Sequence, residues 1–366
     1  MSGSRSSEVA RRSAFVLAAG CLATAAISVP MVSRLPAQPP SRFGIGPSGT
    51  SQPAAAQAGF AQAGFAQPGF AQPSVAQPSV AQAGTAQPAA ANQPAGTVPQ
   101  GVAYERDIEY GTGGGQPLRL DLARPEQLAQ AAPCIVVIHG GAWRGGDKKG
   151  HTDLIFKFAQ AGYVAVTVQY RFCPQNPFPA QIEDVKCAVR FLRAQADRLG
   201  VDPRRIGAIG FSAGAHLAML LGVMGPQDGL EGQGGWADQA SQVQAVVAFF
   251  GPTDLAAEDL PAVSKTLVKD FLGVAAADHP QAAARASPVS YVTRGDAPLL
   301  IFQGTRDPLV PHTQAYRMVE ALTAAGVNGR VELLVNAAHG WKGDELDHSV
   351  EQSFRFFDLR LRRPAR

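Results

Sequence analysis

Cysteine and net charge are both scarce in this sequence of 366 residues. Only four residues are cysteines, and no Cys/His spacing indicates a zinc site, so the sequence predicts no metal and no cofactor. The formal net charge at pH 7 is +3, and no block of basic residues is interleaved with aromatic ones. We therefore expect no nucleic-acid partner, since phosphate binding needs such a block. The sequence does not indicate an oligomeric state.

The cysteines leave two possibilities open. Cys173 and Cys187 could form a disulfide if the protein is exported, because disulfides persist in oxidising compartments. Cys187, however, falls on a predicted helix whose apolar face also holds Ile182, Val185 and Val189. We therefore expect two buried free thiols, with the disulfide as the alternative.

Charge is nearly absent from residues 56–90, where a five-residue unit repeats as Ala-Gln-Ala-Gly-Phe, Ala-Gln-Pro-Gly-Phe and Ala-Gln-Pro-Ser-Val. A segment this rich in Ala, Gln, Pro and Gly cannot bury a core, which predicts a low-complexity linker over residues 39–101. The alternative is a stalk that binds a partner through its repeated phenylalanines. About 260 residues remain, a normal size for one α/β domain.

The segment before the linker is typical of a targeting sequence. Arg11 and Arg12 precede an apolar stretch over residues 14–32, which is long enough for a signal-peptide core and marginal for a membrane span. Residues 1–38 are therefore predicted to be a signal peptide or an N-terminal anchor, and lipidation at Cys21 is a third reading. In each case we expect an exported protein of the periplasm, cell envelope or extracellular space, attached to the membrane or envelope if the segment is retained.

One short motif in the remaining chain carries chemistry. Residues 210–214 read Gly-Phe-Ser-Ala-Gly, between an apolar run at 206–209 and an Ala- and Leu-rich run at 215–221. Strand, sharp turn and helix in this order form a nucleophile elbow, in which glycines remove the clashes that a strained turn would create. Ser212 is then held above a sheet, free to attack a carbonyl group, while N–H groups at the helix start face an oxyanion.

A second glycine motif precedes the elbow. Residues 139–143 read His-Gly-Gly-Ala-Trp and directly follow an apolar run. A strand that ends in His-Gly-Gly-x lets backbone N–H groups approach a substrate oxygen. We expect an oxyanion hole formed by the N–H groups of Gly141, Ala142 and Ala213. The alternative is a plain strand-to-loop turn in which Trp143 is a core aromatic.

Two further chemical groups follow strands near the end of the chain. Asp307 follows an apolar run at 299–303, and His339 follows the last predicted strand at 331–335. Loops after successive strands meet at the edge of an open α/β sheet where catalytic groups collect. The chain order Ser, Asp, His predicts a hydrolase triad in which Ser212 attacks, His339 takes its proton and Asp307 orients the imidazole.

Other residues compete for these roles. Asp254 also follows a predicted strand and could replace Asp307 as the acid, although we favour it as the cap of a short helix. His216 lies inside the helix after the elbow and is predicted to pack or hydrogen-bond there. Trp143 and Trp341 flank the predicted oxyanion hole and base, where they either line a substrate pocket or pack against its wall.

Apolar runs alternate with helical patterns from residue 102 onward, which predicts an α/β fold with a mostly parallel eight-stranded sheet flanked by helices. The only sizeable insertions lie at residues 225–240 and 255–289, and the second is long enough for a small lid at 262–272. Strands are expected at 107–110, 118–122, 134–139, 164–170, 206–210, 245–250, 299–303 and 331–335, and helices at 152–161, 181–199, 213–223, 312–325 and 349–361.

Taken together, these motifs resemble the α/β-hydrolase carboxylesterases that carry a His-Gly-Gly-x oxyanion motif. The chain is similar to hormone-sensitive-lipase-like esterases and, more closely, to compact bacterial carbohydrate esterases of the acetyl-xylan or feruloyl type. Tyr170-Arg171 and the Gly-Pro-Thr-Asp stretch at 251–254 also match, whereas Ala142 and Ala215 stand where glycine is frequent. The resemblance implies an α/β-hydrolase catalytic domain over residues 102–366.

The motifs and the resemblance together predict a serine esterase. We expect carboxylic ester hydrolysis through an acyl-enzyme, on small-molecule or carbohydrate esters with short, acetyl-type acyl groups. Amide hydrolysis of the arylformamidase or peptidase type is the alternative among enzymes, because His-Gly-Gly-x-Trp also occurs in formamidase-like relatives. A non-catalytic surface or binding protein on the same fold is the alternative of another class, and the complete set of Ser212, Asp307 and His339 argues against it.

Overall fold

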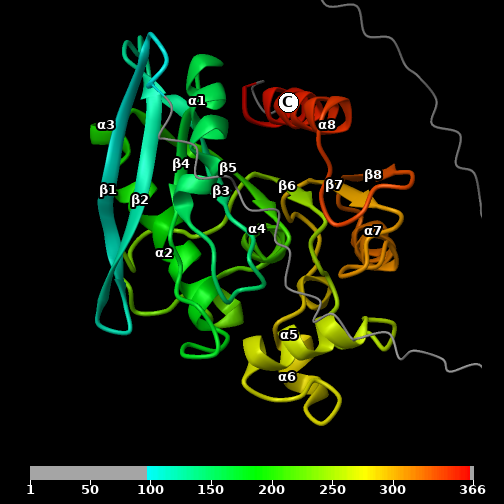
Figure 1. The fold of residues 1–366 in the computed structure, drawn as a ribbon. Coiled ribbons are helices and arrows are strands. Elements are labelled where there is room, and N and C mark those ends of the chain that lie inside the picture. The colour runs from blue at the N-terminus through cyan, green and yellow to red at the C-terminus, as the bar shows by residue number, and fades with distance from the viewer. Residues whose placement is uncertain (1–96, 363–366) are drawn as a thin grey trace, which may run out of the picture. The chain divides into compact units, whose positions relative to one another are not determined.

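The computed structural model describes residues 97–362. The predicted targeting segment and nearly all of the predicted linker lie outside these residues. Within them, an eight-stranded sheet has the order β1-β2-β4-β3-β5-β6-β7-β8 (Figure 1). β1 (Val102–Gly113) and β2 (Gln116–Pro125) form an antiparallel hairpin at one edge, and β2 also pairs antiparallel with β4 (Val164–Val168). Every other neighbouring pair is parallel, which confirms the predicted mostly parallel sheet.

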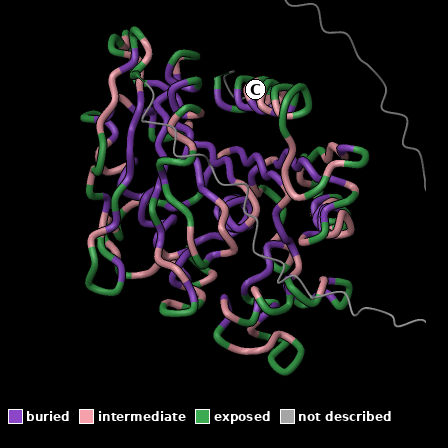
Figure 2. The backbone as a smooth tube through the Cα atoms, viewed as in Figure 1, coloured by how far each residue is buried: buried purple, intermediate pink, exposed green. Residues whose placement is uncertain are grey.

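The central strands are buried on both faces, and they appear as the purple centre of Figure 2. Near-continuous apolar runs are what a parallel sheet covered by helices on both sides requires. The remaining strands are β3 (Ala132–Ile138), β5 (Val201–Phe211), β6 (Ala245–Phe249), β7 (Leu299–Gly304) and β8 (Gly329–Leu334).

Two helical layers cover the sheet, each with its own apolar cluster. One face packs against α1 (Thr152–Gln160) and α8 (Asp344–Phe357). The opposite face packs against α2 (Ala180–Ala194), α4 (Ala213–Val223) and α7 (Thr313–Ala325). Alternate residues of each central strand therefore serve different cores, as the pleat of a strand dictates.

Several predicted boundaries need correction. The helix expected at 181–199 is divided into α2 and the short α3 (Ala196–Leu199), and it ends as predicted at Gly200, which adopts φ 74°. The helix expected at 349–361 begins earlier, at Asp344, because acidic residues in a first turn are stabilised by the helix dipole. β1 and β2 are longer than expected, since the hairpin between them continues the ladder to Gly113.

Residues 97–362 also hold two further α-helices and three cysteines. The second insertion forms α5 (Ala262–Leu272), with the bounds of the predicted lid, and α6 (Pro280–Arg285). Cys134, Cys173 and Cys187 are buried free thiols, so the disulfide alternative does not hold. No helix in residues 97–362 is long and apolar enough to cross a membrane.

Ion pairs with two buried cations link the first insertion, residues 225–240, to α2. Lys186 and Arg190 are only 0% and 2% exposed, and both lie on α2. Lys186 Nζ and Arg190 Nη1 each donate to Glu231 of the insertion, at 2.8 and 2.7 Å. The Ser241 hydroxyl donates to the same carboxylate at 2.9 Å. A single carboxylate therefore neutralises two buried cations.

Glu231→Gln is expected to lower the free energy of unfolding at pH 7 by about 3 kcal/mol, because it leaves two buried cations without an anion. Burial alone raises the pKa of the Glu231 carboxyl, but the hydrogen bond and charge of Lys186 hold it below its ordinary value of 4.5. A lowered folded-state pKa contributes stability above pH 4.5 that is lost as the pH falls through the folded-state value. The difference in free energy of unfolding between the wild type and Glu231→Gln should therefore become smaller at low pH. Urea unfolding across this pH range checks the effect, with the exposed neighbour Gln233→Ala as control. A Glu231→Gln protein as stable as the wild type at pH 7 would contradict it.

Candidate active site

Ser212 occupies a strained turn between β5 and α4. Its backbone has φ 53° and ψ −118°, a region that a residue with a Cβ rarely adopts. A Cβ at Gly210 would lie 2.1 Å from the Gly214 carbonyl oxygen, and a Cβ at Gly214 would lie 2.1 Å from that of Ile138. Both glycines of the motif are therefore required by close backbone approach, which is what the elbow prediction assumed.

The structure brings Ser212, His339 and Asp307 into one hydrogen-bonded chain. His339 Nε2 lies 2.9 Å from Ser212 Oγ, and His339 Nδ1 lies 2.7 Å from Asp307 Oδ2. With its hydrogen on Nδ1, the imidazole donates to Asp307 and accepts from the Ser212 hydroxyl. The three groups come from the loops after β5, β7 and β8, which all open at the carboxyl edge of the sheet.

The Asp307 carboxylate is fixed from behind by its own loop. Its side chain is buried, and Oδ1 accepts the backbone N–H groups of Leu309 and Val310, each at 2.8 Å. Gln303 Nε2 donates to Oδ2 at 3.2 Å. These contacts leave Oδ2 directed at His339, so the carboxylate can orient the imidazole.

Asp254, the alternative acid, is engaged elsewhere. Its Oδ1 accepts the Ala256 N–H at 3.0 Å, and its Oδ2 lies 3.4 Å from Arg317 Nε. Asp254 therefore closes a turn at residues 255–256, and the short helix that we expected it to cap does not form there. The imidazole of His339 is paired with Asp307 instead.

The His-Gly-Gly loop lies directly against the elbow. A Cβ at Gly140 would be 3.3 Å from the Cβ of Ser212. Gly141, Ala142 and Trp143 all have positive φ angles, of 118°, 52° and 57°. Among residues 97–362, the N–H groups of Gly141 and Ala142 donate to no other backbone oxygen. Ala213 is the first residue of α4, where an N–H has no acceptor inside the helix.

The loop therefore presents free N–H groups beside Ser212, at the cost of two adjacent non-glycine residues in a strained conformation. Such strain persists only where the surrounding structure holds it in place. The surrounding structure that supports this loop is the segment after β4 and the packing around Trp143.

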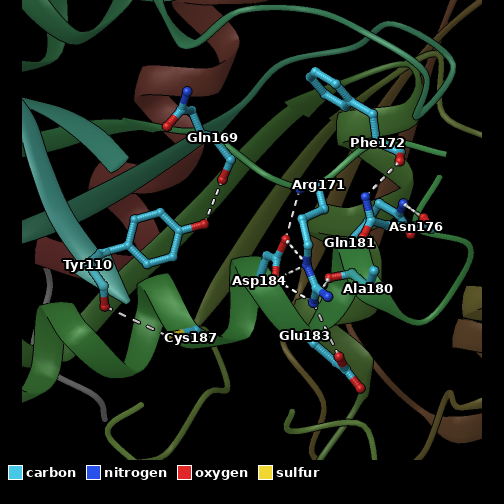
Figure 3. A network of polar contacts seen from close by, with 10 residues as sticks. All are labelled: Tyr110, Gln169, Arg171, Phe172, Asn176, Ala180, Gln181, Glu183, Asp184 and Cys187. Atoms are coloured by element: carbon cyan, nitrogen blue, oxygen red, sulfur yellow. Dashed lines mark hydrogen bonds and ion pairs between the residues drawn. The ribbon is translucent and has the colours of Figure 1, made fainter. Parts of the chain in front are cut away.

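The segment after β4 supports the loop from behind, and Figure 3 shows how Arg171 ties this segment to Asp184 of α2. The Tyr170 hydroxyl donates to the His139 carbonyl oxygen, and the Cys173 N–H donates to that of Trp143, both at 2.9 Å. Between them, the Arg171 guanidinium binds Asp184 through Nε and Nη2, with a shortest contact of 2.7 Å. Asp184 is almost fully buried on α2, and burial raises the pKa of its carboxyl despite the bonds from Arg171. Tyr170 and Arg171, the pair noted in the sequence, thus hold this segment against the His-Gly-Gly loop and against α2.

The two tryptophans proposed as pocket residues pack differently. Trp143 is only 4% exposed, and its ring stacks on Phe271 at 4.2 Å between centroids, so packing is its role in this structure. Trp341 is partly exposed, and its Nε1 donates to Ser349 at 3.1 Å. Phe250, which the sequence reasoning missed, lies 4.7 Å from the His339 ring. The available signal was its place directly after β6, at the same sheet edge.

His216 has the packing role that the sequence predicted. It lies on α4, is fully buried, and forms a hydrogen bond through Nε2 to the Ala286 carbonyl oxygen at 2.7 Å. Burial lowers its pKa to about 4, which keeps the ring neutral at pH 7. In the described part of the chain, no group of three or more His, Cys, Asp or Glu side chains could hold a metal ion.

Comparisons with known proteins agree with this architecture. Esterase LipQ of Mycobacterium tuberculosis is 34% identical over 230 residues, which cover 62% of this chain and 54% of that protein. Esterase LipC of the same organism is 32% identical over 249 residues, covering 65% of this chain and 60% of that protein. The chain thus spans little more than half the length of these curated relatives.

Three solved structures match over more than nine tenths of their length. A truncated carbohydrate esterase from gut microbiota superposes with a TM-score of 0.64 at 25% identity, covering 71% of this chain and 97% of that one. The thermophilic esterase Est2 of Thermogutta terrifontis, solved with bound propionate, gives a TM-score of 0.60 at 27% identity, with 71% and 94% covered. Est2 phosphorylated by paraoxon matches at 28% identity with a TM-score of 0.59, covering 72% of this chain and 95% of that one.

A model of the BD-FAE family matches residues 120–322, more than half of the chain, and this stretch includes the His-Gly-Gly loop, the elbow and Asp307. Together with the eight-stranded sheet and the solved esterase structures, the match confirms the predicted α/β-hydrolase fold. This chain belongs to the BD-FAE family and has the α/β-hydrolase fold.

Proposed function

We propose that this chain is a serine hydrolase that cleaves carboxylic esters through an acyl-enzyme intermediate. One observation carries the proposal: a single imidazole, that of His339, bridges a strained serine hydroxyl at 2.9 Å and a buried carboxylate at 2.7 Å. A hydroxyl is a weak nucleophile at neutral pH and is activated by an adjacent base that a third group orients.

In the acylation step, the Ser212 oxygen attacks the ester carbonyl carbon while His339 Nε2 accepts the hydroxyl proton. The carbonyl oxygen becomes an oxyanion, which the N–H groups of Gly141, Ala142 and Ala213 are placed to stabilise. His339 then gives its proton to the leaving alcohol as the carbon–oxygen bond breaks. Water then attacks the acyl carbon while His339 Nε2 accepts its proton. The bond to Ser212 Oγ breaks, His339 returns the proton to Ser212, and the carboxylic acid leaves.

Asp307 stabilises the imidazolium that forms in each half-reaction. Because its Oδ1 is already occupied by two backbone N–H groups, the carboxylate cannot turn away from His339 without losing them. This fixes the histidine tautomer that leaves Nε2 free to accept a proton.

The alcohol part of the proposed substrate is a sugar or a similar polyol. The carbohydrate esterase among the solved neighbours supports the same class.

A panel of substrates tests this proposal. We expect kcat/KM to be highest for acetyl esters, including acetylated xylo-oligosaccharides and 4-nitrophenyl acetate. For butyrate and ferulate esters, kcat/KM should be lower by about tenfold or more, since acyl pockets discriminate by about 1–3 kcal/mol per methylene. Formanilide should be the poorest substrate. A preference for formanilide would favour an amide hydrolase, and no turnover of any member would favour a binding protein on the same fold.

A further inference from the structure

Helix α5 contacts two loops of the proposed active site: the acid loop, residues 305–311, which carries Asp307, and the oxyanion loop, residues 139–147. Near its N-terminal end, Ser264 is nearly buried, and its hydroxyl donates to the Leu309 carbonyl oxygen at 2.6 Å. The N–H of Leu309 donates in turn to Asp307 Oδ1 at 2.8 Å. The Ser264 hydroxyl is therefore separated from the Asp307 carboxylate by a single residue of the acid loop.

The other end of α5 contacts the oxyanion loop. Phe271 is 0% exposed and stacks on Trp143 at 4.2 Å, with 19° between the ring planes. It also meets His216 of the elbow helix edge-on at 5.5 Å. Asp270 lies 3.4 Å from Arg144, although this pair is exposed enough to contribute little. Trp143 is one of the two strained non-glycine residues of the oxyanion loop, so Phe271 supports that strain directly.

These contacts are not those of a lid. The buried residues of α5 are Ser264, Val268, Phe271 and Leu272, a spacing that places them on one face of the helix. Segments that open and close have few buried contacts, whereas α5 is anchored at both ends by buried groups. Figure 1 shows α5 beside α6, below β6 and β7 in this view.

We propose that α5 is a brace across the active site, which sets the distance between the acid loop and the oxyanion loop. Ser264 and Phe271 are its positioning residues. The inference rests on the proposed esterase function for its catalytic consequences, but the brace itself is a property of the fold. Its two ends act on different parts of the reaction. The N-terminal end holds the loop of Asp307, which orients the base, and the C-terminal end holds the loop whose N–H groups stabilise the oxyanion.

The two ends should therefore fail in different ways. Ser264→Ala loosens the Asp307 loop, so it should lower kcat by about tenfold and move the acid limb of the pH–rate profile to lower pH, since the imidazolium is less stabilised. Phe271→Leu leaves space behind Trp143, so it should lower kcat by about tenfold or more, with KM and the acid limb unchanged. Ser264→Thr keeps a hydroxyl and should restore both the rate and the profile.

The control lies on the opposite face of the same helix. Thr266 is exposed, and its hydroxyl donates only to the Ala262 carbonyl oxygen at 3.1 Å. Thr266→Ala thus removes a hydroxyl from α5 without touching either loop, and it should leave kcat and the pH profile unchanged. All proteins are assayed well below the lowest melting temperature of the set.

A second readout does not depend on activity. Hydrogen–deuterium exchange should increase in residues 305–311 for Ser264→Ala and in residues 139–147 for Phe271→Leu, and in neither for Thr266→Ala. Exchange unchanged in both loops, or fast exchange of α5 itself in the wild type, would overturn the brace and favour a lid. Absence of esterase activity in the wild type would refute the proposed function while the exchange data still decide the brace.

Discussion

Ser212→Ala is expected to lower kcat on 4-nitrophenyl acetate by about 10⁶-fold, the scale at which a serine protease loses turnover without its nucleophile. The melting temperature should stay nearly constant, because the change removes one partly exposed hydroxyl and a single hydrogen bond. Initial rates and thermal melts check both statements.

The matched control is Ser290→Ala, which removes an exposed serine hydroxyl away from the proposed site. It should change neither the rate nor the melt. Substantial esterase activity in Ser212→Ala would show that another group is the nucleophile, and a large loss of stability would make the kinetic result ambiguous with unfolding.

Asp307→Asn should be the second most damaging of these changes, although it keeps the shape of the site. Asp307 Oδ1 faces two backbone N–H groups, so the new amide oxygen takes that place and the NH₂ group faces His339. His339 Nδ1 must then accept, which puts the ring hydrogen on Nε2, where it blocks proton transfer from Ser212. In the serine-protease example this change costs about 10⁴ in turnover, or about 5.5 kcal/mol of barrier.

Asp254→Asn is the comparison that gives this result its meaning. Only a capping bond to Ala256 and the contact with Arg317 are altered, so we expect a loss of at most about tenfold. Both variants are compared with the same acetyl ester at several pH values. If Asp254→Asn were the more damaged protein, the acid of the site would be misassigned, although Ser212 and His339 could still hold their roles.

The residues that sequence alone located are those whose signal is local. A serine between glycines after an apolar run indicates a strained elbow, because few other residues permit that backbone. Asp307 was found because it lies shortly after the buried strand β7, and His339 because it lies shortly after β8, the last strand. Parallel strands deliver the loops that follow them to one edge of the sheet. The sheet was predictable for the same reason, since buried parallel strands are continuous apolar runs.

What the sequence could not predict depends on contacts between distant segments. Trp143 was read as a pocket or core residue, and only the position of Phe271, more than a hundred residues later, decides for the core. Phe250 carries no motif and meets His339 only through the fold. Likewise the length of the second insertion indicated a small lid at 262–272, and only the contacts of Ser264 and Phe271 led us to propose a brace.

Covalent labelling of the wild-type protein tests the central claim most directly. After reaction with paraoxon, mass spectrometry of the intact protein and of its peptides should find one diethylphosphoryl group on Ser212, with esterase activity lost in proportion to labelling. An adduct on any other residue, or full labelling of Ser212 with activity retained, would contradict the assignment of Ser212 as the nucleophile.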